Sequence, residues 1–393
     1  MSDAPAVPFY VKAMAVIGRM AKHVTAEPWP APKRDNRNPA ITGEQDDGSK
    51  AVVEAEGIKG GGQRALLASR PMGEIKESDF KIVEEECPEL GPGEVLIKNI
   101  YISLDPTHRL WASDQPQYMA CVGINNCMRA GIVGKVMKSN SRKWKEGTIC
   151  GGMGGVQEYF VAKEASIYPV IPGVPLPLNL SLFNVVIGLT AWVGVNICEP
   201  KPGQTMVVSG AAGAVGSVAA QLAKARGMKV VGLAGSESKC TWLKDEVKLD
   251  GVINYKTEEL DVGLERCCPE GVDAYFDNVG GKTLETMLTK MNRFGRIAYC
   301  GHISGYNSES AAVSVNQFQM VLMRRLKIQG FICVDHMDEM VKCFAELLDL
   351  YVRGKMKVQE DIQETKVSNY VQCVNMLYTG KNSGKLMMKV SEE

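Results

Sequence analysis

The first half of the chain alternates short apolar runs with turns rich in glycine and proline. The runs lie at residues 65–68, 80–83, 95–103, 131–136 and 156–161, and the longest alternates apolar with polar positions. This spacing is typical of short strands joined by tight turns. We therefore expect a small, partly open β-barrel in this part of the chain.

The second half has a different pattern, in which apolar runs alternate with segments of helical periodicity. A helix that is apolar on nearly every side is expected to begin at Ser181. The last stretch, residues 355–390, returns to short strands and one helix and should rejoin the β-rich domain. Alternating strands and helices predict a doubly wound parallel sheet. Its strands are expected at residues 205–208, 229–233, 251–254, 272–276, 296–300 and 328–332.

A glycine-rich turn, Ser-Gly-Ala-Ala-Gly-Ala-Val-Gly at residues 209–216, separates the first of these strands from a helical segment. A strand, a glycine turn and a helix in this order predict a dinucleotide site, because the glycines admit the pyrophosphate and the helix amides bind it. Since Ala211 replaces the first glycine of the usual motif, an ordinary crossover packed with small residues is the alternative. The expected pyrophosphate ligands are Gly213, Ala214, Val215 and Gly216.

The end of the second strand indicates which dinucleotide binds. NAD sites usually carry a carboxylate there, whereas this strand ends without one. Ser236 is placed to cap the next helix, and Lys239 lies one turn further on, where it can pair with a 2′-phosphate. We therefore expect NADP(H), although Glu237 argues for NAD and Lys239 could equally be a surface lysine.

Two later turns, at residues 277–281 and 300–307, follow the fourth and fifth strands. Doubly wound sheets bind ligands outside the carboxyl ends of their strands, so both turns should line the cofactor cleft. Tyr306 can there donate a hydrogen bond to a substrate oxygen. The alternatives are glycines that only form turns and a tyrosine that only covers the surface.

The composition narrows the class of protein. The 393 residues suit two domains, and 45 basic against 45 acidic residues give no sign of a nucleic-acid partner. The sequence contains no run of 18 or more apolar residues, so no membrane span is predicted. The 12 cysteines lack the spacing of a zinc lobe, so we expect no metal, reduced thiols and a cytoplasmic location.

The first 60 residues differ from the rest. Residues 26–50 are rich in Pro, Asn, Asp and Gly and predict a tail, and Gly60–Gly62 is a candidate hinge. Before the tail, Tyr10, Ala13, Met14, Ile17 and Met20 repeat at helical spacing, opposite Lys12, Arg19 and Lys22. This basic amphipathic segment is either an organelle presequence, a membrane-surface helix or a helix that docks on its own protein.

Several motifs together resemble the zinc-independent medium-chain dehydrogenase/reductase family, in its prostaglandin reductase, alkenal double-bond reductase and curcumin reductase branch. The resemblance covers residues 64–390. It rests on residues 103–106 with Arg109, 188–191, 211–216, 277–281, Arg296-Ile297 with 301–304, and 380–385. The family implies a GroES-like domain over 63–184, an NADP-binding Rossmann domain over 185–350, a return to the first domain over 351–393, and an extension over 1–62.

The resemblance implies NADPH-dependent reduction of a carbon–carbon double bond conjugated to a carbonyl in a small-molecule substrate. Tyr306 resembles the donor to the developing enolate oxygen, Lys239 and Tyr255 the 2′-phosphate and adenosine contacts, and Asn382 a nicotinamide-side contact. The family branch also implies a homodimer. We further expect cofactor contacts from Ser236, Asn278, Cys300, Ile303 and Ser304. The expected substrate-pocket residues are Asp105, Arg109, Trp111 and Tyr118.

The chain departs from the family where Thr107 and His108 replace the usual Tyr-Met, and where Val156 replaces a tryptophan. A tyrosine of the substrate pocket is thereby lost, and Trp111 with Tyr118 can compensate. His108 fits a buried neutral histidine better than a catalyst. Two other functions remain open: a quinone reductase of the same superfamily, and a non-catalytic NADP-binding structural or regulatory protein.

Overall fold

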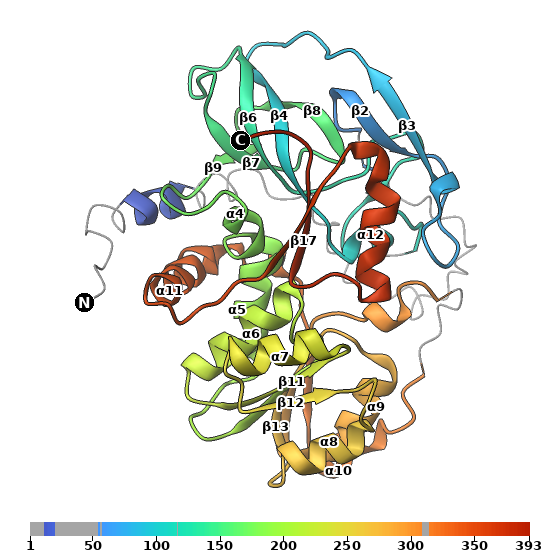
Figure 1. Cartoon of the computed structure of the whole chain (residues 1–393), viewed down its shortest axis with the longest axis vertical. Coiled ribbons are helices and arrows are strands. Elements are labelled where there is room, and N and C mark those ends of the chain that lie inside the picture. Colours follow the sequence, from blue (N-terminus) through green and yellow to red (C-terminus); the bar gives the residue numbers. More distant parts are fainter. Residues whose placement is uncertain (1–11, 20–53, 56, 116, 309–313) are drawn as a thin grey trace, which may run out of the picture.

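The computed structural model describes residues 12–19, 54–55, 57–115, 117–308 and 314–393. They form an antiparallel sheet domain and a parallel sheet domain, drawn at the top and bottom of Figure 1, with α4 and α5 between them. The fold therefore combines the two sheet types that the hydrophobic pattern predicts.

The antiparallel domain is a nine-stranded sheet in which distant segments pair. Strand β17 from the end of the chain lies antiparallel to β4, with Met388 opposite Ile102, so the C-terminal segment rejoins this domain. Its core holds inward-facing aliphatic and aromatic residues such as Ile97, Val136 and Phe160. The strands are β2 (Gly60–Leu67), β3 (Phe80–Glu85), β4 (Glu94–Ser103), β6 (Ile132–Ser139), β7 (Ile149–Gly152), β8 (Gln157–Lys163), β9 (Ile167–Pro169), β16 (Glu360–Glu364) and β17 (Lys385–Lys389). A separate pair joins β1 (Glu54–Ala55) to β5 (Cys121–Val122).

The hinge expected at Gly60–Gly62 is wrong, because these residues begin β2 and pair with β8. A Cβ on Gly60 would lie 2.1 Å from the Tyr159 carbonyl oxygen, and Gly62 has φ +67° beside a break in the strand register. The glycines allow this close, bulged pairing.

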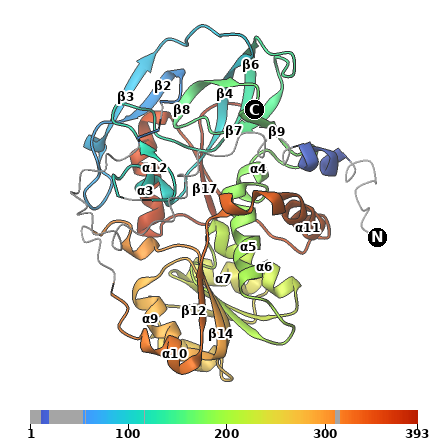
Figure 2. The same cartoon turned by 180° about the vertical axis from the view of Figure 1, so that it is seen from behind.

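The parallel domain has the strand order β12-β11-β10-β13-β14-β15. The chain order reverses between β10 and β13, which is the point where such sheets bind ligands. Figure 2 shows α9 and α10 at the end of this domain farthest from the antiparallel sheet. The strands are β10 (Thr205–Val208), β11 (Lys229–Ala234), β12 (Gly251–Asn254), β13 (Val272–Asp277), β14 (Met291–Tyr299) and β15 (Lys327–Gly330). The helices are α6 (Ala214–Ala225), α7 (Glu237–Asp245), α8 (Leu260–Cys267), α9 (Gly281–Lys290), α10 (Gln319–Arg324) and α11 (Met340–Val352).

The apolar segment between the domains does not start as one helix at Ser181. It consists of α4 (Leu178–Ser181), a π-helical turn at Val185–Leu189 and α5 (Thr190–Ile197). Asn184 restarts the helix, since its side chain accepts a hydrogen bond from the Val186 amide at 2.7 Å. Residues 178–197 are long and apolar enough to cross a membrane, and an 18-residue window within them has a mean hydropathy of 1.8, but 72% of that window is buried inside the protein.

A helix at residues 12–19 packs on the molecule (blue in Figure 1). Ala13, Val16 and Ile17 are buried in the same core as Ile171 and Leu178. This favours the docking helix among the interpretations of the amphipathic segment. Tyr10, Met20, Lys22 and the tail predicted at residues 26–50 lie outside the described residues.

Candidate functional site

The N-terminus of α6 is open to a ligand. Gly213 occupies its N-cap without a side-chain hydrogen bond, and the first turn holds no acidic residue. A Cβ on Gly216 would lie 2.3 Å from the Gly210 carbonyl oxygen, so this glycine permits the close contact between helix and turn. The helix dipole and the backbone amides of the first turn suit a pyrophosphate.

A loop from the other end of the chain lies against the glycine-rich turn. The Gly384 amide donates to the Ala212 carbonyl at 3.1 Å, and Gly384 forms a parallel bridge with Gly213. Asn382 is 9% exposed, and its Nδ2 donates to the Gly384 carbonyl at 3.0 Å. The fold thus brings Asn382 to the cofactor turn across some 170 residues of sequence.

The N-terminus of α7 is closed by its own residues. Ser236 is its N-cap, and the hydroxyl accepts from the Lys239 amide at 3.4 Å. The Lys239 ammonium donates to the Gly380 carbonyl at 2.7 Å. Burial lowers the pKa of Lys239, and the positive charge of Lys256 lowers it further. Two ammonium groups close enough to repel form a suitable partner for a phosphate dianion.

Lys256 is a residue that the sequence analysis missed. Tyr255 and Lys256 follow β12, whose parallel pairing with β11 places them beside the end of β11. The Tyr255 hydroxyl would lie 2.5 Å from a Cβ on Gly235, which confirms that this side chain covers the end of β11. Pairing of neighbouring strands was the signal that could have found Lys256.

The loop at residues 300–306 is fastened to the turn after β13. Amides of Cys300 and Gly301 donate to the Asp277 carbonyl at 2.9 and 3.0 Å, and the Ser304 hydroxyl donates to the Val279 carbonyl at 2.6 Å. The Ile303 amide donates to the Asn278 carbonyl at 3.3 Å. The two predicted turns therefore form one unit, which carries Tyr306.

The turn itself is fixed by a buried carboxylate. Asp277 Oδ1 accepts from the amides of Val279 and Gly280 at 3.0 and 2.9 Å and from the Tyr275 hydroxyl at 2.8 Å. Asn278 Nδ2 donates to the Ser209 carbonyl at 2.7 Å. Asn278 thus links the turn to the end of β10 at the switch point.

The Tyr306 hydroxyl oxygen accepts from the His302 amide at 3.3 Å. Burial raises the pKa of Tyr306 above its usual value. The phenol therefore keeps its proton at neutral pH and can donate it to an oxyanion.

Trp111 and Tyr118 form a bonded pair in the antiparallel domain, and Tyr118 lies near this loop. Trp111 Nε1 donates to the Tyr118 hydroxyl at 3.0 Å, and the Arg129 guanidinium lies 5.3 Å over the Trp111 ring. Burial raises the pKa of Tyr118, and its phenol interacts electrostatically with Tyr306 and Cys333. The fold brings this predicted pair toward Tyr306, and their contact with substrate stays a prediction.

Asp105 and Arg109 are both buried inside the antiparallel domain. The Asp105 carboxylate is 4% exposed, pairs with Lys385 at 2.9 Å and accepts from the Ser103 hydroxyl. The pairing with Lys385 lowers the pKa of Asp105 in spite of its burial. Arg109 donates to the carbonyls of Pro71 and Gly73, both at 2.9 Å. Their polar atoms are thus occupied by protein partners, and their place in a substrate pocket stays a prediction.

His108 is fully buried, as the sequence indicated. Its Nδ1 lies 3.1 Å from the Tyr370 hydroxyl, and burial lowers its pKa to about 4. This imidazole is neutral at physiological pH and packs against Trp111 of the same short helix, α3 (Thr107–Trp111), with ring centroids 5.4 Å apart.

Two further features bear on the choice of site. Among the residues that the structure describes, no group of three or more His, Cys, Asp or Glu side chains could hold a metal ion. A cavity of about 550 Å³ lies near the end of α11, with Tyr351, Lys357 and Glu360 in its lining. None of its lining residues belongs to the candidate site.

Known proteins match this chain over both of its sheet domains. The model of an N-terminal domain of oxidoreductases matches residues 63–170, and the model called zinc-binding dehydrogenase matches residues 214–352. A putative NADP-dependent oxidoreductase of Bacillus subtilis is 37% identical over 84% of this chain and 98% of its own length. The NADP⁺-dependent 2-alkenal reductase of Nicotiana tabacum is 34% identical over 84% of this chain and 98% of its own length.

A solved structure is also similar. CurA of Vibrio vulnificus in complex with NADPH superposes with a TM-score of 0.80 at 32% identity, covering 84% of this chain and all of that one.

Proposed function

Because this chain belongs to the zinc-independent medium-chain dehydrogenase/reductase family, we propose that it is an NADPH-dependent reductase of carbon–carbon double bonds conjugated to a carbonyl. The observation that carries the proposal is Tyr306, a half-buried phenol held on the loop that is fastened to the turn at residues 277–281, with its proton retained. The substrates are enals and enones, including lipid enones of the 15-oxo-prostaglandin type.

The cofactor is NADP(H), and the residues present fit it. The uncapped N-terminus of α6 suits the pyrophosphate, and Lys239 with Lys256 suits the 2′-phosphate. Ser236 and Tyr255 lie at the adenosine end of the proposed cofactor site. The loop residues Cys300, Ile303 and Ser304 lie at its nicotinamide end. When bound, NADPH supplies a hydride to the β-carbon of the substrate.

Tyr306 stabilises the charge that develops on the substrate. Reduction at the β-carbon moves negative charge onto the carbonyl oxygen, and a preorganised donor at that oxygen lowers the barrier. The phenol can fill this role because its oxygen already accepts from His302, which leaves its proton for the substrate. The α-carbon is then protonated to complete the reduction.

A substrate comparison tests the reaction class. NADPH oxidation is followed at 340 nm with a 2-alkenal, a cyclic enone and a simple benzoquinone. Turnover of the alkenal and the enone with little turnover of the quinone is expected. Quinone turnover without enone turnover would establish the quinone reductase, and absence of all turnover despite NADPH binding would favour the non-catalytic protein.

The variant Tyr306→Phe tests the assigned donor. Loss of a donor to the oxyanion is expected to lower kcat about 100-fold with little change in the Kd of NADPH. The Kd is measured by NADPH fluorescence. An unchanged kcat would remove Tyr306 from the mechanism.

The proposal includes a homodimer. Among the described residues β15 pairs only with β14, and neither β15 nor α10 contains a buried residue. Phe318, Leu322 and Met323 are 62%, 73% and 57% exposed beside this edge. A second copy of the chain would cover these side chains. Light scattering is expected to give twice the mass of the chain, and Leu322→Glu is expected to give the monomer.

The protein is expected to act in the cytoplasm. All 12 cysteines carry free thiols in the structure, which suits a reducing compartment. Import through the N-terminal segment is the alternative, and fractionation of cells with and without residues 1–19 distinguishes the two.

A further inference from the structure

The orientation of the Tyr306 hydroxyl depends on where the backbone of His302 lies. Only the His302 amide is found donating to the Tyr306 oxygen among the described contacts, at 3.3 Å. The imidazole of His302 projects from the same residue, so holding the ring limits where its backbone amide can lie.

The imidazole of His302 is held on three sides. Its Nδ1 lies 2.6 Å from the Tyr299 hydroxyl oxygen, a short hydrogen bond. A Cβ on Gly280 would lie 2.0 Å from Nδ1, and a Cβ on Gly305 would lie 2.3 Å from Cδ2. Gly280 also has φ +67°, which favours glycine. The two glycines therefore leave space for the ring on both sides and leave it little freedom to move.

Tyr299 is suited to hold the ring. It ends β14, inside the parallel sheet, so its backbone is fixed by pairing with β13 and β15. Burial raises its pKa to about 12, which keeps the phenol protonated and able to share this bond throughout the neutral range.

We propose that Tyr299 and His302 are positioning residues, which hold the His302 amide against the Tyr306 oxygen and so direct the Tyr306 proton toward the substrate. The inference rests on the proposed role of Tyr306 in reduction. It adds two side chains that act through Tyr306 and set the geometry of the donor.

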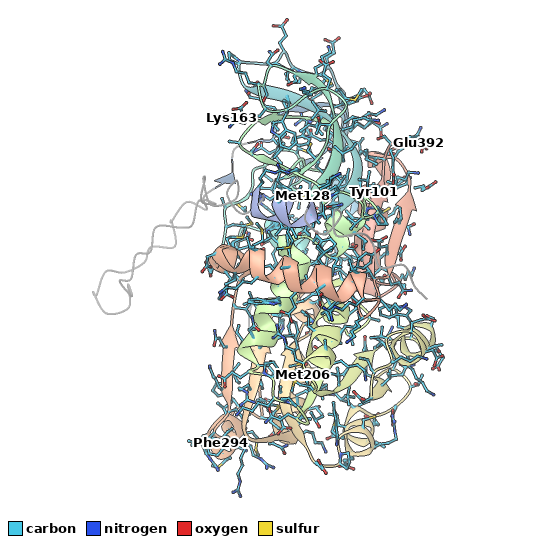
Figure 3. All side chains as sticks on the ribbon, turned by 90° about the vertical axis from the view of Figure 1, so that its left-hand side faces the viewer. Tyr101, Met128, Lys163, Met206, Phe294 and Glu392 are labelled. Atoms are coloured by element: carbon cyan, nitrogen blue, oxygen red, sulfur yellow. The ribbon has the colours of Figure 1, made fainter. Side chains whose placement is uncertain are left out.

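The primary test is Tyr299→Phe, which removes a single oxygen atom. A small misplacement of the donor is expected to lower kcat about tenfold with the KM for NADPH unchanged. His302→Ala is expected to give a similar loss. His302→Asn keeps a polar atom near the position of Nδ1 and is expected to recover most of kcat. Tyr101→Phe is the matched control, because the Tyr101 hydroxyl donates to Glu393 at 2.7 Å in the antiparallel domain (Figure 3) and its loss should leave kcat unchanged.

A double-mutant cycle separates positioning from structural damage. If Tyr299 acts through Tyr306, Tyr299→Phe has no further effect on kcat in the Tyr306→Phe background. An equal loss in both backgrounds, or no loss in the parent, would overturn the inference. Failure of the proposed function is a different outcome, in which Tyr306→Phe itself retains full kcat. Thermal unfolding of each variant verifies that it is folded. The cycle uses only Tyr299→Phe and Tyr306→Phe, so it remains valid if His302→Ala does not fold.

Discussion

The cofactor side and the substrate side of the site differ in the groups that form them. The cofactor side is largely backbone: the uncapped start of α6 and the loops fastened at residues 277–280 and 300–306. The substrate side is made of side chains, with Trp111 bonded to Tyr118 above the buried His108. A backbone site depends on where glycine allows close approach, whereas a side-chain site depends on individual polar groups and their protonation. The two sides should therefore fail in different ways when altered.

Gly216→Ala is expected to have the largest effect. The added Cβ would meet the Gly210 carbonyl oxygen at 2.3 Å, a backbone atom that cannot swing away. Overpacking of this kind should lower the free energy of unfolding by roughly 3 kcal/mol. Urea denaturation measures it, with Gly131→Ala as control, since its Cβ would have no neighbour nearer than 3.8 Å. Equal stability of the two variants would show that the turn tolerates a side chain.

The substrate side is expected to be sensitive to acid through His108. Its pKa is about 4 in the folded protein and 6.5 in the unfolded chain, so the unfolded state binds more protons between these values. Stability is therefore present above pH 6.5 and is lost as pH falls toward 4, on the order of 2–3 kcal/mol. Asp105 has a lowered pKa and titrates below this window.

The variant His108→Gln isolates this contribution. It cannot titrate, while its amide can still bond to Tyr370. Urea denaturation of both proteins at pH 7, 5.5 and 4 is expected to show a smaller loss of stability in the variant. Parallel curves for the two proteins would assign the acid sensitivity to other groups.

Lys239→Ala tests the part of the cofactor side where a side chain supplements the backbone. Loss of a charge-assisted partner of the 2′-phosphate should raise the KM for NADPH about tenfold. The KM for NADH, which lacks that phosphate, should change little. Lys244→Ala on the exposed part of α7 is the matched control. A similar rise for both cofactors would mean that Lys239 acts through its bond to Gly380.

Tyr118→Phe should have the smallest effect. It removes the acceptor of the Trp111 indole N–H, a bond of roughly 1 kcal/mol, and should raise the KM for an enone about threefold to fivefold. The Kd of NADPH should not change. If kcat falls as far as in Tyr306→Phe, Tyr118 takes part in the reaction itself.

Local pattern could predict much of this fold, because its signals are short. Alternation, glycine turns and helical periodicity each involve neighbouring residues, and the strand, turn and helix around residues 205–225 appear as expected. The predictions from local pattern were wrong where one sequence signal is compatible with two structures. Gly60–Gly62 suggested a hinge but forms a bulged strand, and the apolar run after Ser181 suggested one helix but is interrupted at Asn184.

The sequence by itself determined the two sheet types, the glycine turn, the missing carboxylate after β11 and the tyrosine after β14, since each depends on residues close together in the chain. Only the tertiary structure decided that Asn382 reaches the glycine turn, that Lys256 joins Lys239, and that Lys385 neutralises Asp105. It also placed Tyr299 and His302 around the donor. These contacts depend on strand pairing and burial between distant segments, which no local pattern encodes.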